Sequence, residues 1–267
     1  MSINRRQFLR RAGLLTALGL GGSLAFTGFR KKEVAVAAEY ALDQQSSLAS
    51  RWAMVVDMSK FKTEDDYNQV REACHHIHNV PEDIGNLKDE IKWIWKDDYE
   101  HTFTGQQNKY LEEHLIDAPF MVMCNHCENP PCCKACPTQA TFQRRDGIVA
   151  MDFHRCIGCR FCMAACPFGA RSFNFRDPRP FIKEIQPNFP TRTKGVVEKC
   201  NFCEERLSVG LMPACVEKSN GGLIFGDLGD PNSEVRKIIS TKFTIRRKPE
   251  LGTQPSVYYL VGGGDHA

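Results

Sequence analysis

The sequence predicts an α+β fold made of two interleaved βαβ modules, with long loops inserted into and between them. Three observations predict it. Cysteines are unusually frequent, with 13 in 267 residues, and most stand in closely spaced groups. Short apolar segments of strand type adjoin these groups. Two long stretches, 79–118 and 177–195, interrupt the series and are expected to be inserted loops.

The densest cysteine group has the spacing C-x2-C-x2-C-x3-C-P, which in bacterial ferredoxins binds [4Fe–4S] clusters. Three thiolates of such a group reach one cluster, and the fourth, which precedes the proline, reaches another. A near copy stands before this group and a shorter group follows it. The three groups are Cys124, Cys127, Cys132 and Cys136; Cys156, Cys159, Cys162 and Cys166; and Cys200, Cys203 and Cys215. The two modules are therefore expected to be bacterial-ferredoxin-like and cluster-binding.

Two other uses of cysteine are weighed against this interpretation. Zinc sites use C-x2-C pairs but seldom place four cysteines within eleven residues, as the run from Cys156 to Cys166 does. Disulfides are the ordinary expectation for an exported protein. Their geometry does not require the ferredoxin spacing, which occurs here beside a near copy of itself. The pattern therefore favours iron–sulfur clusters over zinc and disulfides.

Local patterns predict the individual elements in chain order. Apolar runs predict buried strands, and an Asp-Gly pair between two such runs predicts a hairpin, since glycine can take the positive φ of the turn. Short helices are expected after two of the cysteine loops. The expected strands are Trp52–Asp57, Pro119–Met123 and Arg171–Phe175, the hairpin is Thr141–Asp152 turning at Asp146-Gly147, and the helices lie near Gly158–Ala165 and Asn201–Gly210.

The segments outside the modules carry weaker signals. The loop 79–118 contains Trp93 and Trp95, which slightly favours docking to a partner over a plain surface excursion. The loop 177–195 is rich in proline. The tail from Thr241 has no motif, and its glycines 262–264 indicate a flexible end rather than a phosphate loop. The net charge of +3 is too small to indicate nucleic-acid binding.

The N-terminus predicts the compartment. Residues Asn4–Arg10, with Arg5-Arg6 at their centre, look like a twin-arginine export signal. An uncharged, weakly hydrophobic stretch follows from Ala12 to Phe29, and Ala35-Val36-Ala37 offers a cleavage site. A membrane anchor is the alternative, because the stretch reaches the lower length limit of a spanning helix. We expect a protein in the periplasm or on the outer face of the cytoplasmic membrane.

The cysteine groups resemble those of the four-cluster iron–sulfur electron-transfer subunits that accompany molybdopterin oxidoreductases, polysulfide reductases and formate-dependent nitrite reductases. The resemblance covers about residues 51–228. In that family four motifs exchange their last cysteines, the second with the third and the first with the fourth. It implies three ligand sets here: Cys124, Cys127, Cys132 and Cys166; Cys156, Cys159, Cys162 and Cys136; and Cys200, Cys203, Cys215 and Cys74.

The same exchange rule implies that a fourth cluster is absent. The family places three cysteines after the position of Asp57, but residues 58–73 contain none, and Ser219 stands where the last cysteine of motif four is expected. All four ligands of one site are missing together, so three [4Fe–4S] clusters are expected. Serine can ligate iron, but a plain hydroxyl is the stronger interpretation of Ser219. Cys133 is expected to be a buried small side chain, with a register slip that makes it a ligand as the alternative.

The resemblance implies a function without catalysis by this chain. The protein is expected to be an electron-transfer subunit that links a polytopic quinone-interacting membrane subunit to a multihaem cytochrome c subunit, and no nucleic acid or small-molecule substrate is expected. Two stretches, 73–81 and 90–95, look most like the periplasmic iron–sulfur subunit of the membrane complex that accompanies dissimilatory sulfite reductase, which implies sulfur metabolism. The alternatives are a subunit of a nitrite or polysulfide reductase system and a zinc-binding structural protein.

Four histidines near the cysteines, His75, His76, His78 and His126, could donate hydrogen bonds to cluster sulfurs, although packing or solvation is the more ordinary role of each. No haem-attachment, P-loop or nucleophile motif occurs. The expected organisation is a signal peptide at 1–37, a linker at 38–50, a one-cluster module at 51–78 plus 196–228, an insertion at 79–118, a two-cluster module at 119–176, a proline-rich loop at 177–195 and a C-terminal extension at 229–267.

Overall fold

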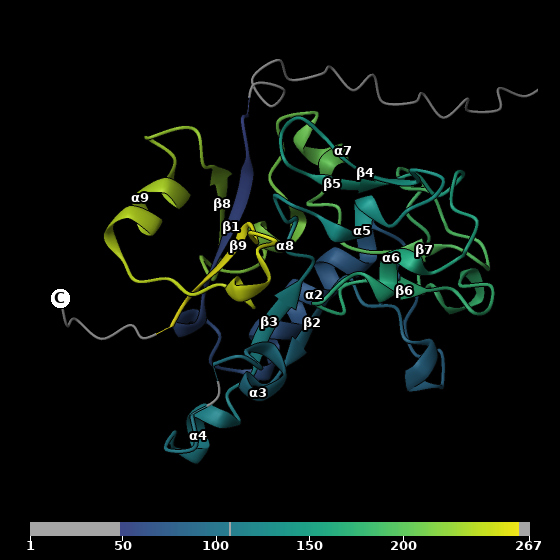
Figure 1. Cartoon of the computed structure of the whole chain (residues 1–267). Coiled ribbons are helices and arrows are strands. Elements are labelled where there is room, and N and C mark those ends of the chain that lie inside the picture. The colour runs from purple at the N-terminus through teal and green to yellow at the C-terminus, as the bar shows by residue number, and fades with distance from the viewer. Residues whose placement is uncertain (1–48, 107, 262–267) are drawn as a thin grey trace, which may run out of the picture. The chain divides into compact units, whose positions relative to one another are not determined.

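A three-stranded sheet joins three distant parts of the chain (Figure 1). The computed structural model describes residues 49–106 and 108–261, so the expected signal peptide and nearly all of the linker lie outside the described residues. Strand β1 (Trp52–Asp57) is central. It pairs antiparallel with β8 (Leu223–Asp227) and parallel with β9 (Val257–Leu260). The strand predicted at Trp52–Asp57 is confirmed, and the C-terminal extension, which carries no motif, supplies its second neighbour.

The alternation of side chains along β1 divides the interior into two cores. Met54 and Val56 face the main core, whereas Ala53 and Val55 face a smaller one. Helix α9 (Glu234–Thr241) covers this second face and buries Val235 there. These four consecutive side chains of β1 are all fully buried, as the continuous apolar run predicts for a strand that is covered on both faces.

Three two-stranded antiparallel sheets surround the cysteine-rich region. They are β2 (Ile94–Asp97) with β3 (Phe120–Met123), β4 (Thr141–Gln143) with β5 (Val149–Met151), and β6 (Ser172–Phe173) with β7 (Val197–Glu198). The predicted hairpin is β4–β5, and Gly147 in its turn has φ +82°. Only glycine adopts this conformation without steric cost.

Short helices follow the cysteine loops. They are α5 (Pro131–Lys134), α6 (Phe161–Ala164), α7 (Glu204–Leu207) and α8 (Ala214–Glu217). The helices expected near 158–165 and 201–210 are confirmed as α6 and α7, each a single turn. Helix α6 ends before Cys166 because the residue preceding a proline disfavours helical backbone.

The longest helix in the described part of the chain is α2 (Glu64–Ile77). Thr63 and Asp66 form a capping box at its start. Its buried face carries Tyr67, Val70 and Cys74, at helical spacing. The remaining helical elements are α3 (Tyr99–Thr102), α4 (Glu113–Ile116), η2 (Met58–Lys60), η3 (Leu87–Asp89), η4 (Arg179–Phe181) and η5 (Pro249–Leu251). No helix in residues 49–106 and 108–261 combines the length and apolar character needed to cross a bilayer.

The insertion 79–118 is more ordered than the sequence indicates. It contributes β2 to a sheet with β3, and it buries Trp93 to 1% exposure. The Trp93 indole donates to Glu198 at 2.7 Å, and the Glu198 carboxylate also accepts from Arg192 and Asn174. The Trp93 side chain therefore belongs to the core and is not itself available to a partner, whereas docking by the loop stays a prediction.

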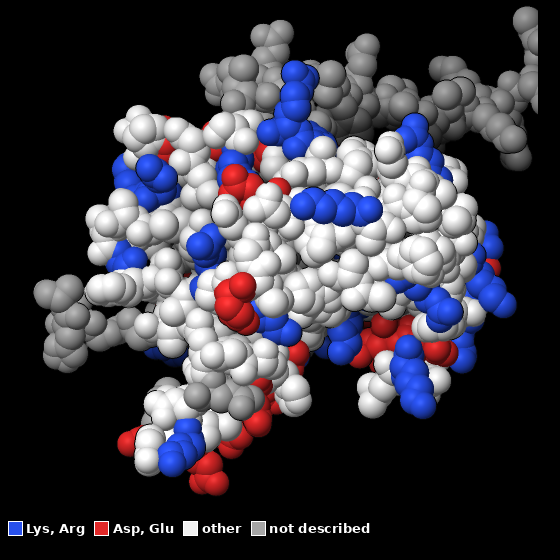
Figure 2. Space-filling view, viewed as in Figure 1, with Lys and Arg blue, Asp and Glu red and all other residues white. Residues whose placement is uncertain are grey.

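Surface charge is dispersed on the face drawn in Figure 2. Basic side chains are scattered over a large uncharged area, and acidic ones lie at several places, with groups at the lower left and lower right of the view. The area over α5, α6 and β7 is largely uncharged in this view. This face offers no continuous basic tract of the kind that binds a nucleic-acid backbone.

The buried ion pair of Arg192 and Glu198 yields a stability prediction. Both side chains are 0% exposed. We expect Glu198→Ala to lower the free energy of unfolding by about 3–5 kcal/mol, because it leaves a buried guanidinium without its carboxylate. Urea unfolding followed by tryptophan fluorescence measures this change.

The matched control is Glu64→Ala, which removes the carboxylate of the exposed pair with Lys96. We expect a loss of at most about 1 kcal/mol there, since water screens the pair. Equal losses in the two variants would contradict the prediction.

Candidate iron–sulfur cluster sites

The first expected ligand set lines a single cavity. Cys124 and Cys127 follow β3, Cys132 lies in α5 and Cys166 follows α6, and all four contribute to the wall of this cavity. Proline and aromatic side chains complete the wall, namely Pro130, Pro131, Pro167 and Phe168. The cysteine from the following motif is thus brought to the three from the preceding one. The assignment of these four cysteines as ligands of one cluster stays a prediction.

The electrostatics of this cavity favour a metal centre. Burial, with Cys124 beside it, raises the pKa of the Cys127 thiol to about 12. Burial, together with Cys124 and Cys132, also raises the pKa of Cys166. Thiols crowded in an apolar cavity stay protonated until a metal centre binds to the sulfurs and displaces the protons. The hydrogen bond from Cys133 instead lowers the pKa of the Cys132 thiol to about 5. Four thiols around one cavity fit the Cys₄ ligand set of a [4Fe–4S] cluster.

The third expected set is wholly buried and joins residues more than a hundred positions apart. Cys74 lies in α2, Cys200 follows β7, Cys203 begins α7 and Cys215 lies in α8, which packs against α2. Burial, followed by the proximity of Cys200, Cys215 and Cys203, raises the pKa of the Cys74 thiol. Cys74, isolated in sequence, is therefore a neighbour of the three cysteines with which the resemblance groups it.

The second expected set lies closer to the surface. Cys162 is buried, Cys156 and Cys136 are half-buried, and Cys159 is exposed. Cys156 and Cys162 belong to one apolar cluster with Val149 and Val197. The Cys136 thiol lies 3.6 Å from the Thr138 hydroxyl, and its grouping with the other three stays a prediction. This is the set with the greatest access to solvent.

The backbone between the cysteines has a shared conformation. Each C-x2-C step contains a residue at positive φ: His126 (+40°), Gly158 (+70°), Arg160 (+63°) and Phe202 (+56°). Backbone that alternates between right- and left-handed conformations turns successive N–H groups toward one side and forms an anion-binding concavity. The Phe202 N–H, for example, donates to the Cys200 sulfur at 3.5 Å. These loops therefore suit thiolate ligands, which carry negative charge.

The region that lacks cysteines is filled by other interactions. Residues 58–73 form η2 and most of α2, and Phe61 packs on the Tyr67 ring at 5.0 Å between centroids. Phe61 also lies against Gly222, where an added Cβ would approach its ring to 2.7 Å. The Ser219 hydroxyl donates to the Val216 carbonyl at 2.8 Å and accepts from the Leu223 N–H at 2.9 Å. These bonds support the plain-hydroxyl interpretation of Ser219.

The histidines and Cys133 take mainly structural positions. His126 stacks on Phe202 at 3.7 Å and accepts from the Val149 N–H. His78 bonds to Glu205 at 2.8 Å, and its Nδ1 lies 3.6 Å from the sulfur of Cys74, an expected ligand. Cys133 is half-buried and lies outside the cavity wall that Cys132 joins.

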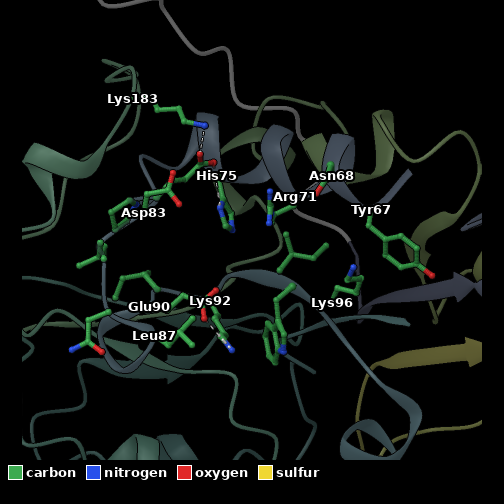
Figure 3. A pocket seen from close by; sticks show the side chains of 18 of the residues that line it. Tyr67, Asn68, Arg71, His75, Asp83, Leu87, Glu90, Lys92, Lys96 and Lys183 are labelled. Atoms are coloured by element: carbon green, nitrogen blue, oxygen red, sulfur yellow. Dashed lines mark ion pairs between the residues drawn. The ribbon is translucent and has the colours of Figure 1, made fainter. Parts of the chain in front are cut away.

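A large cleft lies apart from the cysteine sites (Figure 3). It has a volume of about 540 Å³ and runs between α2 and the segment 81–96. Its wall contains three ion pairs, and the two charges of each pair neutralise each other: Lys183 with Glu82, Lys92 with Glu90 and Lys96 with Glu64. His75 and Arg71 point into it from α2. None of the cysteines lines this cleft, so it is separate from the expected cluster sites.

Two buried cations beside the cysteine groups are not predicted from the sequence. Arg171 lines the first cavity, and Lys199 directly precedes Cys200; they are 4% and 1% exposed. Arg171 is the lone charge between Cys166 and Phe175, whereas Lys199 directly follows Glu198. A charged residue where a strand pattern demands an apolar one is the signal that points to such positions.

Comparison with known proteins agrees with this geometry. Residues 118–178 match the family model of a 4Fe-4S dicluster domain. The chain is 37% identical to the Hdr-like menaquinol oxidoreductase iron-sulfur subunit 1 of Archaeoglobus fulgidus, over 98% of this chain and 100% of the relative. It is 34% identical to a tetrathionate reductase subunit of Salmonella typhimurium, over 97% and 89%. It is 32% identical to the iron-sulfur cluster-binding subunit of menaquinone reductase of Nitratidesulfovibrio vulgaris, over 79% and 88%.

The position of Ser219 yields a prediction. We expect Ser219→Ala to lower the free energy of unfolding by about 1–3 kcal/mol, because the Leu223 N–H loses its hydroxyl acceptor in a buried turn. Iron content should stay at the wild-type value. Chemical unfolding and iron analysis of the same preparation measure both quantities, and a loss of four irons per chain in this variant would show instead that Ser219 is a ligand.

Proposed function

The chain belongs to the family of iron–sulfur electron-transfer subunits of multisubunit oxidoreductases, and on that premise we propose that it binds three [4Fe–4S] clusters, through which electrons pass between two redox partners. The observation that carries the proposal is the cavity at which Cys166 meets Cys124, Cys127 and Cys132. It is the arrangement expected when neighbouring ferredoxin motifs exchange their last cysteines. The proximity of Cys74 to Cys200, Cys203 and Cys215 supports the same rule for a second pair of motifs.

The twelve proposed iron ligands form three sets. These are Cys124, Cys127, Cys132 and Cys166; Cys156, Cys159, Cys162 and Cys136; and Cys200, Cys203, Cys215 and Cys74. A [4Fe–4S] cluster with four thiolate ligands supplies single-electron transfer and has no open coordination position. The chain is therefore proposed to be an electron-transfer subunit and not an enzyme by itself.

The face around Cys159 is the proposed contact with the membrane subunit. Cys159 is the exposed cysteine among the twelve. Apolar side chains stand exposed near it in sequence, with Ile157 at 67% and Phe161 at 61%. Exposed apolar side chains close together mark a protein interface. Two of the relatives are named for menaquinol or menaquinone chemistry, which supports a quinone-interacting membrane partner for this chain.

The remaining parts of the proposal rest on the sequence. The twin-arginine pattern at residues 4–10 supports a periplasmic location, or one on the outer face of the cytoplasmic membrane. The short stretches 73–81 and 90–95 support a multihaem cytochrome c partner and a role in dissimilatory sulfur metabolism. Purification from native membranes identifies the partners directly. Recovery of this chain with neither a membrane subunit nor a cytochrome would contradict this assembly.

A subunit of a tetrathionate, polysulfide or nitrite reductase system is the second candidate. The identity to the tetrathionate reductase subunit over 97% of this chain favours it. The partner distinguishes the candidates, since a co-purifying molybdopterin subunit supports the second and a multihaem cytochrome supports the first.

The number of clusters is directly measurable. We expect about twelve irons and about twelve sulfides per chain, with the brown absorption of [4Fe–4S] centres, because each Cys₄ set holds four irons. Cys133→Ala should retain all of them. A colourless protein that contains zinc would contradict the iron–sulfur assignment altogether, and sixteen irons would reveal a fourth site.

The grouping of Cys74 has its own test. We expect Cys74→Ala to bind about eight irons instead of about twelve, because the third set loses one thiolate. The electron paramagnetic resonance spectrum of the reduced variant should lack the signal of one cluster. Twelve irons with an unchanged spectrum would overturn this assignment.

A further inference from the structure

Arg171 is a buried cation, and none of the carboxylates in residues 49–106 and 108–261 forms an ion pair with it. Its guanidinium donates to the Thr141 hydroxyl at 2.7 Å and lies 3.6 Å from the Met151 sulfur, and both of these partners are neutral. Arg192 is equally buried but is paired with Glu198. A charge removed from water costs several kcal/mol unless an opposite charge or a full set of hydrogen bonds compensates it. The surroundings of Arg171 must therefore supply negative charge.

The groups that face Arg171 are cysteines of two different sets. It lines the first cavity together with Cys124 and Cys132. Cys132 also packs in one apolar cluster with Cys162 of the second set, where α5 lies against α6. The Arg171 side chain is also within hydrogen-bonding reach of the sulfurs of Cys132 and Cys162. Arg171 thus stands between the first and second expected sites.

We propose that Arg171 is a counter-ion shared by the first and second cluster sites, and that its positive charge raises the reduction potential of both. The inference rests on the proposed function, since it requires that the two cysteine sets hold clusters. Reduction adds one negative charge to a cluster, and a fixed cation nearby in a medium of low dielectric constant stabilises that charge. Net charge near a cluster is one of the factors that set its potential. The third set, which surrounds Cys74 and Cys203, does not face Arg171 in the contacts described above.

The test is a redox titration of the purified holoprotein monitored by electron paramagnetic resonance. We expect Arg171→Gln to decrease the equilibrium constant for reduction about tenfold at two of the three clusters, which corresponds to midpoint potentials about 59 mV lower for a one-electron couple. The third cluster should keep its potential. Intact clusters with three unchanged potentials would overturn the inference.

Three control variants separate charge from packing. Arg171→Lys keeps a cation and should restore most of the wild-type potential. Thr141→Val removes the hydroxyl acceptor but leaves the guanidinium charge, so its potentials should match the wild type. Arg155→Gln removes a cation that is 64% exposed and precedes Cys156, and water should screen most of its effect. A purely structural role for Arg171 predicts instead that Thr141→Val and Arg171→Gln behave alike.

A further variant covers the case in which Arg171→Gln loses its clusters. Met151→Glu places a carboxylate next to the guanidinium, so the net charge is cancelled while Arg171 remains. We expect the same two potentials to fall, and intact clusters with unchanged potentials in this variant would overturn the inference. Iron analysis of the wild type distinguishes a failure of the proposed function from a failure of the role proposed for Arg171. A wild type without iron contradicts the proposed function, whereas an iron-replete wild type whose potentials are insensitive to these changes contradicts only the role of Arg171.

Discussion

The buried ion pair between Arg192 and Glu198 is the interaction on which the arrangement of the cysteine-rich region depends. The guanidinium also donates to the carbonyls of His78 and Asn79, at the end of α2, and the carboxylate accepts from Trp93 in the insertion. One pair thus ties the proline-rich loop, the insertion, β7 and α2 together. Because the pair is supported by these further hydrogen bonds, burial of two charges is compatible with a stable core.

This pair lies next to two of the segments that carry cysteines. Glu198 stands two residues before Cys200, and His78 stands one helical turn after Cys74. His78 stacks on Trp93 at 4.5 Å and reaches Glu205 in α7. The same network therefore fixes the ends of both segments, and the relation of Cys74 to Cys200 follows from it. The insertion, which the sequence presents as a loop, is part of this support.

The sequence predicts an element correctly where the residues that determine it are close together along the chain. The β4–β5 hairpin and the one-turn helices depend on local rules, such as the positive φ at Gly147 and the proline after Cys166, and they are predicted correctly. The pairing of β9 with β1 and the burial of Trp93 depend on partners far along the chain. No local pattern encodes those partners. The cysteine sets are predicted in part from local sequence. The spacing identifies each group of cysteines, but only the family's exchange rule relates one group to another.

The contrast between Arg171 and Arg192 shows why burial alone does not define the role of a residue. Arg192 has a carboxylate at 0% exposure, so its charge is neutralised within the protein and its contribution is structural. Arg171 has a hydroxyl and a thioether, neither of which carries charge. Because neither partner is charged, an anionic group bound beside Arg171 would stabilise its buried charge. The cysteines that share its cavity are the groups that can hold such an anion, so cluster binding and folding of this region are expected to be coupled.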